Sequence, residues 1–101
     1  EISFDKIPLI DEVVKFAKKD IIPGGTKKNL AYNKKDIEFS SIYSEYKKYI
    51  LADAQTSGGL LMSCPRENSK NLIKSLNKIS KYKSKIIGKF TNKQNCNIIC
   101  N

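Results

Sequence analysis

Two short segments, each built around a pair of glycines, hold the residues whose types and spacing best suit chemistry. Glycine tolerates positive φ angles and lets the backbone approach a ligand closely. Hydroxyl and amide groups beside such a turn, where a regular element begins, suit a phosphate or another anion. We therefore expect an anion site, with the turns serving only folding and domain docking as the alternative. The members are Gly24, Gly25, Thr26 and Asn29 in the first segment, and Thr56, Ser57, Gly58 and Gly59 in the second.

Asp53 lies three residues before the second segment, which begins at Thr56. It would either bind a magnesium ion or hold the loop by accepting hydrogen bonds from its own backbone amides, and we favour the second role. Thr26 has a similar alternative, since its hydroxyl would also suit the cap of a short helix running to Tyr32. The chain has no histidine, so no serine or cysteine has the partner that a nucleophilic triad needs. We expect no catalytic residue and no metal ligand set in this chain.

Length and composition indicate one modest domain. The 101 residues include 40% hydrophobic and 29% charged side chains, and no apolar run is long enough for a membrane helix. The net charge of +9 raises the alternative of a small nucleic-acid-binding module. Only one of the 19 basic residues is arginine, which base and phosphate readers favour, so we do not expect nucleic acid as a partner.

Three cysteines, with no Cys-x-x-C pair and no histidine, do not supply the four ligands of a structural zinc site. On a strand, Cys96 and Cys100 would share a face but lie about 13 Å apart, beyond disulfide reach. We therefore expect free thiols and a reducing, cytoplasmic location. The chain opens inside a strand-like segment with neither an initiator Met nor a secretory leader, which predicts a domain taken from a longer protein.

The elements that would position the two glycine segments alternate along the chain. Apolar spacing predicts helices over 9–19, 26–32, from 40–41 to about 50, and from 65 to 79. Short apolar runs predict strands over 2–7, 60–64, 85–91 and 96–100, with a turn at 92–95 making the last two an antiparallel hairpin. We interpret Tyr46 and Tyr49 as packing residues of an amphipathic helix. The pattern predicts an α+β fold, with a mixed four-stranded sheet layered with helices.

The residue order of the two glycine segments is more specific than their composition. PGGT-(basic)-(basic)-N-L at 23–30 and D-(small)-Q-T-S-G-G-L-L at 53–61 resemble the C-terminal domain of selenophosphate synthetase (selenide, water dikinase). The resemblance extends to a helix start at Pro65 and to Ile86-Ile87-Gly88, so it covers nearly the whole chain. Related families, aminoimidazole ribonucleotide synthetase and thiamin-monophosphate kinase, are alternatives that these two motifs disfavour.

This resemblance implies a single C-terminal domain, residues 1–101, that forms one wall of an active-site cleft. The family makes selenophosphate from selenide, ATP and water, giving AMP and phosphate. Its catalytic cysteine or selenocysteine, its lysine and its magnesium-binding aspartates belong to an N-terminal domain, so this chain alone would be inactive and hold neither Mg²⁺ nor ATP. The partners implied are that domain, the small substrates and a second subunit. Lys27 and Lys28 stand at the family's basic positions and would neutralise phosphate.

Overall fold

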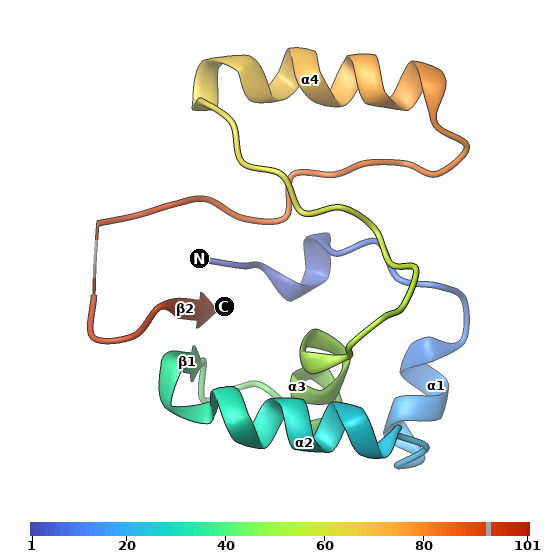
Figure 1. The fold of residues 1–101 in the computed structure, drawn as a ribbon, viewed down its shortest axis with the longest axis vertical. Helices are drawn as coiled ribbons and strands as arrows, with labels where there is room; N and C mark the ends of the chain where they lie inside the picture. The colour runs from blue at the N-terminus through green and yellow to red at the C-terminus, as the bar shows by residue number, and fades with distance from the viewer. Residues whose placement is uncertain (93) are drawn as a thin grey trace.

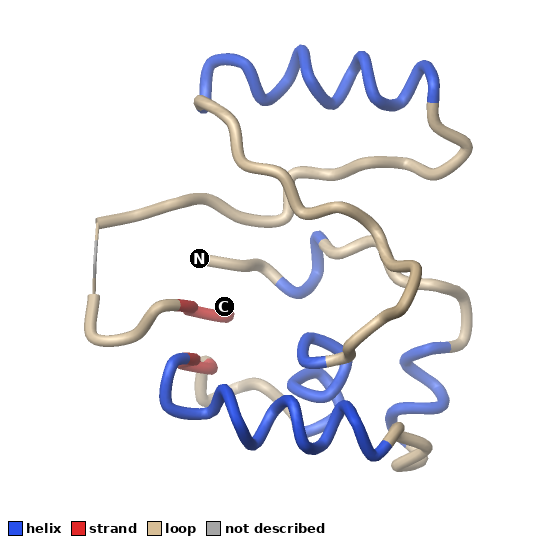
Figure 2. Tube along the Cα trace, in the orientation of Figure 1, coloured by secondary structure: helices blue, strands red, loops and turns tan. Residues whose placement is uncertain are grey.

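A computed structural model of the chain describes residues 1–92 and 94–101. The very small sheet lies at one side of the view in Figures 1 and 2, and long connections join the helices. The elements in chain order are the 3-10 helix η1 (Phe4–Lys6), α1 (Val13–Lys18), α2 (Gly24–Asn33), the 3-10 helix η2 (Lys34–Asp36), β1 (Ile37–Phe39), α3 (Glu45–Ala52), α4 (Arg66–Ile79) and β2 (Ile98–Cys100).

Each predicted helix is present, although the boundaries differ. The helix expected over 9–19 is shorter, because Glu12 has φ of 66° and Asp20 has φ of 56°, and left-handed residues interrupt a right-handed helix at both ends. α3 begins at Glu45 rather than at 40–41, after an extended Ser44. α4 begins directly after Pro65, within one residue of the expected start.

The sheet differs from the prediction. β1 and β2 pair in parallel, with Ile37 opposite Ile98 and Phe39 opposite Cys100. The antiparallel hairpin of 85–91 with 96–100 is therefore wrong, and the turn expected at 92–95 includes residue 93, which lies outside the described residues. No strand was predicted over β1, although its apolar–charged–apolar order, with Glu38 exposed between half-buried neighbours, is the pattern of a strand.

Two further segments join the sheet through single bridges. Ile2 pairs in parallel with Cys100 and antiparallel with Gly88, so it lies between them. The predicted strands 2–7 and 85–91 are reduced to these contacts, because Phe4–Lys6 turns into a 3-10 helix that buries Phe4. The predicted strand 60–64 is absent and its side chains are exposed. The class α+β is confirmed, but the four-stranded sheet is not formed by the described residues.

The core lies where η1, α3 and the sheet meet. Phe4, Tyr43 and Cys100 are buried there, with Leu9, Ile37, Phe39, Ile50 and Leu51 packed against them. The rings of Phe4 and Tyr43 are 6.2 Å apart in an edge-to-face arrangement. The Tyr43 hydroxyl donates to the carbonyl of Asn101 at 2.9 Å and accepts from the amide of Phe4 at 3.3 Å. This side chain therefore ties together both ends of the chain.

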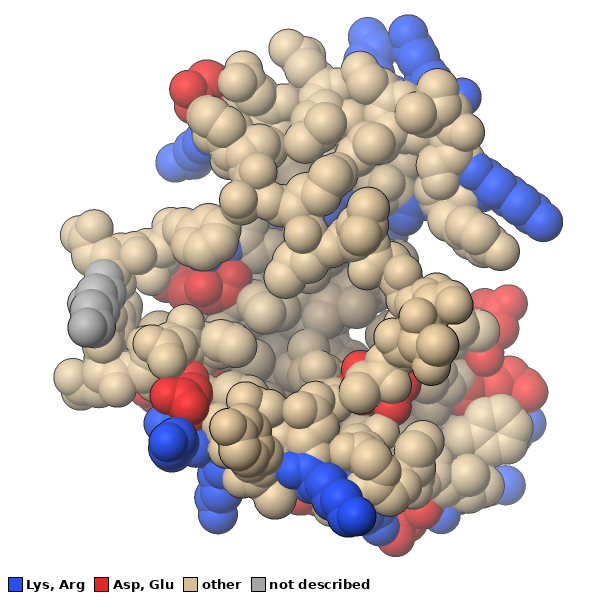
Figure 3. Space-filling model, viewed as in Figure 1, with Lys and Arg blue, Asp and Glu red and all other residues tan. Residues whose placement is uncertain are grey.

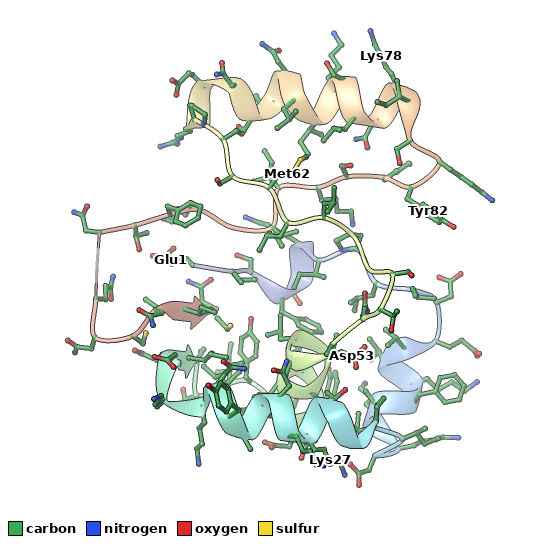
Figure 4. The ribbon with its side chains drawn as sticks, viewed as in Figure 1. Glu1, Lys27, Asp53, Met62, Lys78 and Tyr82 are labelled. Carbon is green, nitrogen blue, oxygen red and sulfur yellow. The ribbon has the colours of Figure 1, made fainter. Side chains whose placement is uncertain are left out.

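α4 lies apart from α1, α2 and α3 (Figure 1). Its predicted stripe of Leu72, Ile73 and Leu76 is half-buried, whereas Ile79 is 85% exposed. Met62 lies below this helix and Lys78 points away above it (Figure 4). Within the described part of the chain, no helix has the length and apolar character needed to span a lipid bilayer.

Candidate functional site

The first glycine segment is the start of a helix rather than a loop. Pro23 is the extended residue before α2, and Gly24 and Gly25 form its first two positions. Neither glycine has a positive φ, so this segment does not use the left-handed conformations that glycine tolerates. The amides of a helix's first turn have no carbonyl partner within the helix, and the helix dipole makes this end electropositive. The segment can thus offer backbone donors to an anion without a glycine-specific conformation.

Thr26 and Asn29 face inward from α2. Thr26 is 2% exposed, and its hydroxyl donates to Oδ1 of Asp53 at 2.5 Å. Nδ2 of Asn29 donates to the carbonyl of Ala52 at 2.7 Å. The structure therefore brings the first segment against the beginning of the second one, between α2 and the end of α3. The capping role for Thr26 is wrong, because no side chain caps α2.

Asp53 ends α3, and its carboxylate accepts from the Thr26 hydroxyl. The favoured role, in which Asp53 accepts from its own loop amides, is not seen among the hydrogen bonds of the described residues. No group of three or more His, Cys, Asp or Glu side chains is placed to hold a metal ion in residues 1–92 and 94–101.

The second glycine segment leaves this contact as an exposed loop. Residues 54–59 are exposed, including Thr56, Ser57, Gly58 and Gly59. By analogy with open α/β sheets, which gather their ligands at one edge, the sequence also predicts that Thr26 and Thr56 approach each other at one edge of the sheet. These two residues share no hydrogen bond in the described part of the chain, and the contact that joins the segments lies between helices. An added Cβ at Gly58 would come within 2.6 Å of Oε1 of Gln55, whereas one at Gly59 would meet nothing within 4 Å.

Lys27 and Lys28, the two basic residues of the first segment, are both exposed on α2. Lys27 lies 3.1 Å from a carboxylate oxygen of Asp20 and 5.6 Å from the centre of the Tyr49 ring. Figure 4 shows Lys27 below α2 and Asp53 above it, so this ammonium group points away from the contact between the two segments. Lysines are spread over the rims of the face seen in Figure 3 and do not form one patch there.

Two shallow hollows lie beside the site. One, of about 390 Å³, separates α2 from α3 and is lined by Lys27, Lys34, Phe39, Lys48 and Tyr49, among others. The other, of about 320 Å³, includes Lys18, Tyr46 and Tyr49. The tyrosines are half-buried, and Lys18 and Lys27 lie over their rings at 5.3 and 5.6 Å, so these faces are covered by the chain itself.

One residue of the site was missed by sequence reasoning. Nδ2 of Asn33 donates to Oδ1 of Asn29 at 3.0 Å and to the Asn29 carbonyl at 2.9 Å. The available clue was the spacing, since residues four apart are neighbours on a helix surface.

The three cysteines differ in exposure. All three are free, as expected; Cys64 is exposed, Cys96 is half-buried and Cys100 is buried. Burial raises the pKa of the Cys100 thiol from its ordinary value, so this group stays protonated at neutral pH.

Comparison with known proteins gives consistent relatives. A selenide, water dikinase of Aliarcobacter butzleri is 40% identical over 100 residues, which is 99% of this chain and 29% of that protein. The Myxococcus xanthus protein of the same name is 43% identical over 75 residues, 74% of this chain and 21% of the relative. One from Clostridium botulinum is 38% identical over 93 residues, 92% of this chain and 27% of the relative.

The chain thus spans less than a third of the length of these relatives. No family model matches the sequence, and no solved structure matches it.

Proposed function

The chain belongs to the selenide, water dikinase family, and from this we propose that it is the C-terminal domain of a longer enzyme that makes selenophosphate. That enzyme would use selenide, ATP and water and release AMP and phosphate in the cytoplasm. This domain forms one wall of the cleft, and the remainder of the same chain supplies the catalytic residues and holds Mg²⁺ and ATP. The whole enzyme works as a homodimer.

The observation that carries this proposal is the open space around three glycines. An added Cβ at Gly24, Gly25 or Gly59 would meet nothing within 4 Å, and none has a positive φ. Glycine at a helical position costs up to about 1 kcal/mol relative to alanine. Neither packing nor backbone conformation within this chain therefore calls for glycine. We attribute the requirement to something outside the domain that approaches the backbone closely, namely an anionic substrate or the facing domain.

Helix electrostatics support an anion at the first segment. The amides of Gly24 and Gly25 precede the first hydrogen bonds of α2, which are donated by Thr26 and Lys27 to the Pro23 carbonyl at 3.1 and 3.4 Å. A helix N-terminus with free amides suits a phosphate group. The hydroxyls of Thr56 and Ser57 are exposed and would extend this donor surface. Lys28 adds positive charge near the same end of the helix, whereas the charge of Lys27 is paired with Asp20.

Uncovered apolar surface supports a neighbouring domain. The chain exposes 8407 Å², whereas a compact monomer of its 11.4 kDa mass would expose about 5,800 Å². Leu60 and Leu61, directly after the second glycine segment, are 91% and 78% exposed. Exposed apolar patches mark interaction sites, so we assign this strip to docking on the remainder of the longer chain.

The test is enzymatic assay of the full-length protein containing this sequence. We expect selenide-dependent formation of AMP and selenophosphate, followed by phosphorus NMR. Aminoimidazole ribonucleotide synthesis or thiamin-monophosphate phosphorylation in place of it would assign the chain to a related family. Absence of all three activities, with tight and steeply salt-dependent binding to single-stranded nucleic acid, would support the nucleic-acid module and overturn the proposal.

The cleft wall is tested separately by Gly59→Val. The new side chain enters open space in this domain, so we expect only a small change in melting temperature. In the full-length enzyme it would obstruct a close backbone approach, and we expect kcat/KM to fall by roughly 100-fold. A stable variant with wild-type activity would contradict the cleft wall without affecting the family assignment.

A further inference from the structure

A short chain of polar contacts joins the first two turns of α2 to the end of α3. It begins at Asp53, whose carboxylate accepts from the buried Thr26 hydroxyl. It continues through Asn29, which donates to the Ala52 carbonyl at 2.7 Å. Asn33 completes it by donating to Oδ1 of Asn29 at 3.0 Å. We call this set of Thr26, Asn29, Asn33 and Asp53 the α2–α3 clasp.

The groups of the clasp are occupied with one another. The Thr26 hydroxyl proton goes to Asp53, so it is not free to donate to a ligand. The Asn29 amide uses its nitrogen on Ala52 and its oxygen on Asn33. Thr26 is also 2% exposed, which leaves its hydroxyl almost no surface for a substrate to touch. Thr26 is thus unsuited to the ligand contact that its place in the motif first implied, and both polar atoms of Asn29 already make a hydrogen bond within the domain.

The position of Asp53 has an electrostatic reason. A carboxylate at the C-terminal end of α3 is disfavoured by the dipole of that helix. Its partner Thr26 lies in the first turn of α2, where the dipole favours a negative charge. The negative charge of Asp53 is therefore stabilised by the N-terminal end of α2 and not by α3, the helix that it ends.

The clasp fixes the point from which the second glycine loop departs. Asp53 is held to α2 by its side chain, and its amide donates to the Ile50 carbonyl at 3.4 Å. Residues 54–59 follow immediately and are exposed. Holding Asp53 against α2 keeps the beginning of this loop beside the start of α2.

We infer that Thr26, Asn29, Asn33 and Asp53 are positioning residues, which hold the 54–59 loop beside the α2 N-terminus and bind neither substrate nor metal. This rests on the proposed function in one respect: the loop and the helix start form the cleft wall. The juxtaposition itself is a property of the domain. A displacement of about 1 Å at such a wall can lower the rate by up to about 100-fold.

The test in the full-length enzyme uses paired substitutions. Thr26→Val keeps the side-chain shape but removes the hydroxyl, and Asp53→Ala removes the acceptor; each should lower kcat/KM by about 10-fold to 100-fold. Thr26→Ser and Asp53→Asn keep a donor and an acceptor oxygen, so both should recover most of the activity. The Thr26→Val, Asp53→Ala double variant should lose little more than either single variant, because residues in direct contact are not additive. Thr91→Val, an exposed threonine outside the clasp, is the control.

Asp53→Asn separates the clasp from a metal site. If Asp53 held magnesium, Asp53→Asn would be as inactive as Asp53→Ala, and raising the Mg²⁺ concentration would raise its activity. Activities are compared at a temperature where circular dichroism shows every variant folded. An inactive Asp53→Asn, or a folded Thr26→Val with wild-type activity, would overturn the inference.

Hydrogen exchange gives a result that does not depend on activity. Thr26→Val and Asp53→Ala should accelerate amide exchange in the first turns of α2 and the last turn of α3, whereas Thr26→Ser, Asp53→Asn and Thr91→Val should not. If the wild-type enzyme lacks the proposed activity but exchange follows this order, the function fails and the clasp stands. If exchange is unchanged in Thr26→Val and Asp53→Ala, the clasp fails.

Discussion

Replacing Gly25 by alanine should affect the stability of this domain and the activity of the proposed cleft in opposite directions. The residue is at the second position of α2, has no positive φ, and would place its new Cβ in open space. Alanine reduces the conformational entropy of the unfolded chain, which stabilises a protein by about 0.4–1 kcal/mol where the native backbone permits it. For a domain of this size, that corresponds to a rise in melting temperature of roughly 2–8 °C.

Gly88→Ala is the matched control, since the same substitution should have the opposite sign. An added Cβ at Gly88 would overlap the Glu1 carbonyl oxygen and lie 3.2 Å from Cα of Ile2, where the single bridge to Ile2 holds the two backbones together. Overpacking of this kind typically costs about 1–3 kcal/mol. Thermal unfolding of the 101-residue chain, followed by circular dichroism, measures both variants.

The activity of the full-length enzyme completes the comparison. Because the proposed cleft requires close approach to the α2 N-terminus, Gly25→Ala should raise stability while lowering selenide-dependent kcat/KM by about 10-fold or more. A Gly25→Ala variant that is less stable than wild type would refute the structural reasoning. One that is more stable and fully active would refute the reason proposed for the glycine.

Four further outcomes are expected. The 101-residue chain alone should show no ATP-dependent phosphorylation of selenide. Clear turnover by the purified chain would refute the proposal that the catalytic residues belong to the remainder of the longer chain. Tyr43→Phe removes a hydroxyl that bonds both chain ends, so chemical denaturation should show a loss of about 1 kcal/mol with little change in m; an unchanged midpoint would contradict this. Mass spectrometry after iodoacetamide treatment should show Cys64 modified first and Cys100 last, because Cys100 is buried with a raised pKa. Raising the pH past the ordinary pKa of a thiol should destabilise the fold, because the Cys100 thiol ionises at a lower pH in the unfolded chain than in the folded one.

The helices could be predicted because the information for them is local. In α4, an apolar residue recurs every three or four positions and Pro65 precedes the first turn, so the sequence predicts both the helix and its start. Boundaries were wrong where a single backbone conformation decided them. Nothing in the type of Glu12 indicates a left-handed φ angle, and aspartate, although it tolerates this conformation, does not by itself mark Asp20 as the residue that ends α1.

The candidate site was partly predictable for the same reason. The wording of the two glycine segments identified the family, and nearly the full chain matches a selenide, water dikinase. The contacts of single residues did not follow from that residue order. Thr26 and Asn29 looked like ligand residues, but burial and contacts across 27 and 23 positions of sequence turn them toward α3.

The sequence by itself determined the presence of the helices and the family. A helix depends on the pattern of neighbouring residues, and the family follows from the residue order of the two glycine segments. Only the tertiary structure decided the pairing of Ile37 with Ile98, the position of Ile2 between Gly88 and Cys100, and the contact of Thr26 with Asp53. The physical reason is that strand pairing and buried polar contacts join distant parts of the chain. Their free energy depends on which partners packing brings together, and a local pattern such as Ile37-Glu38-Phe39 is compatible with many partners.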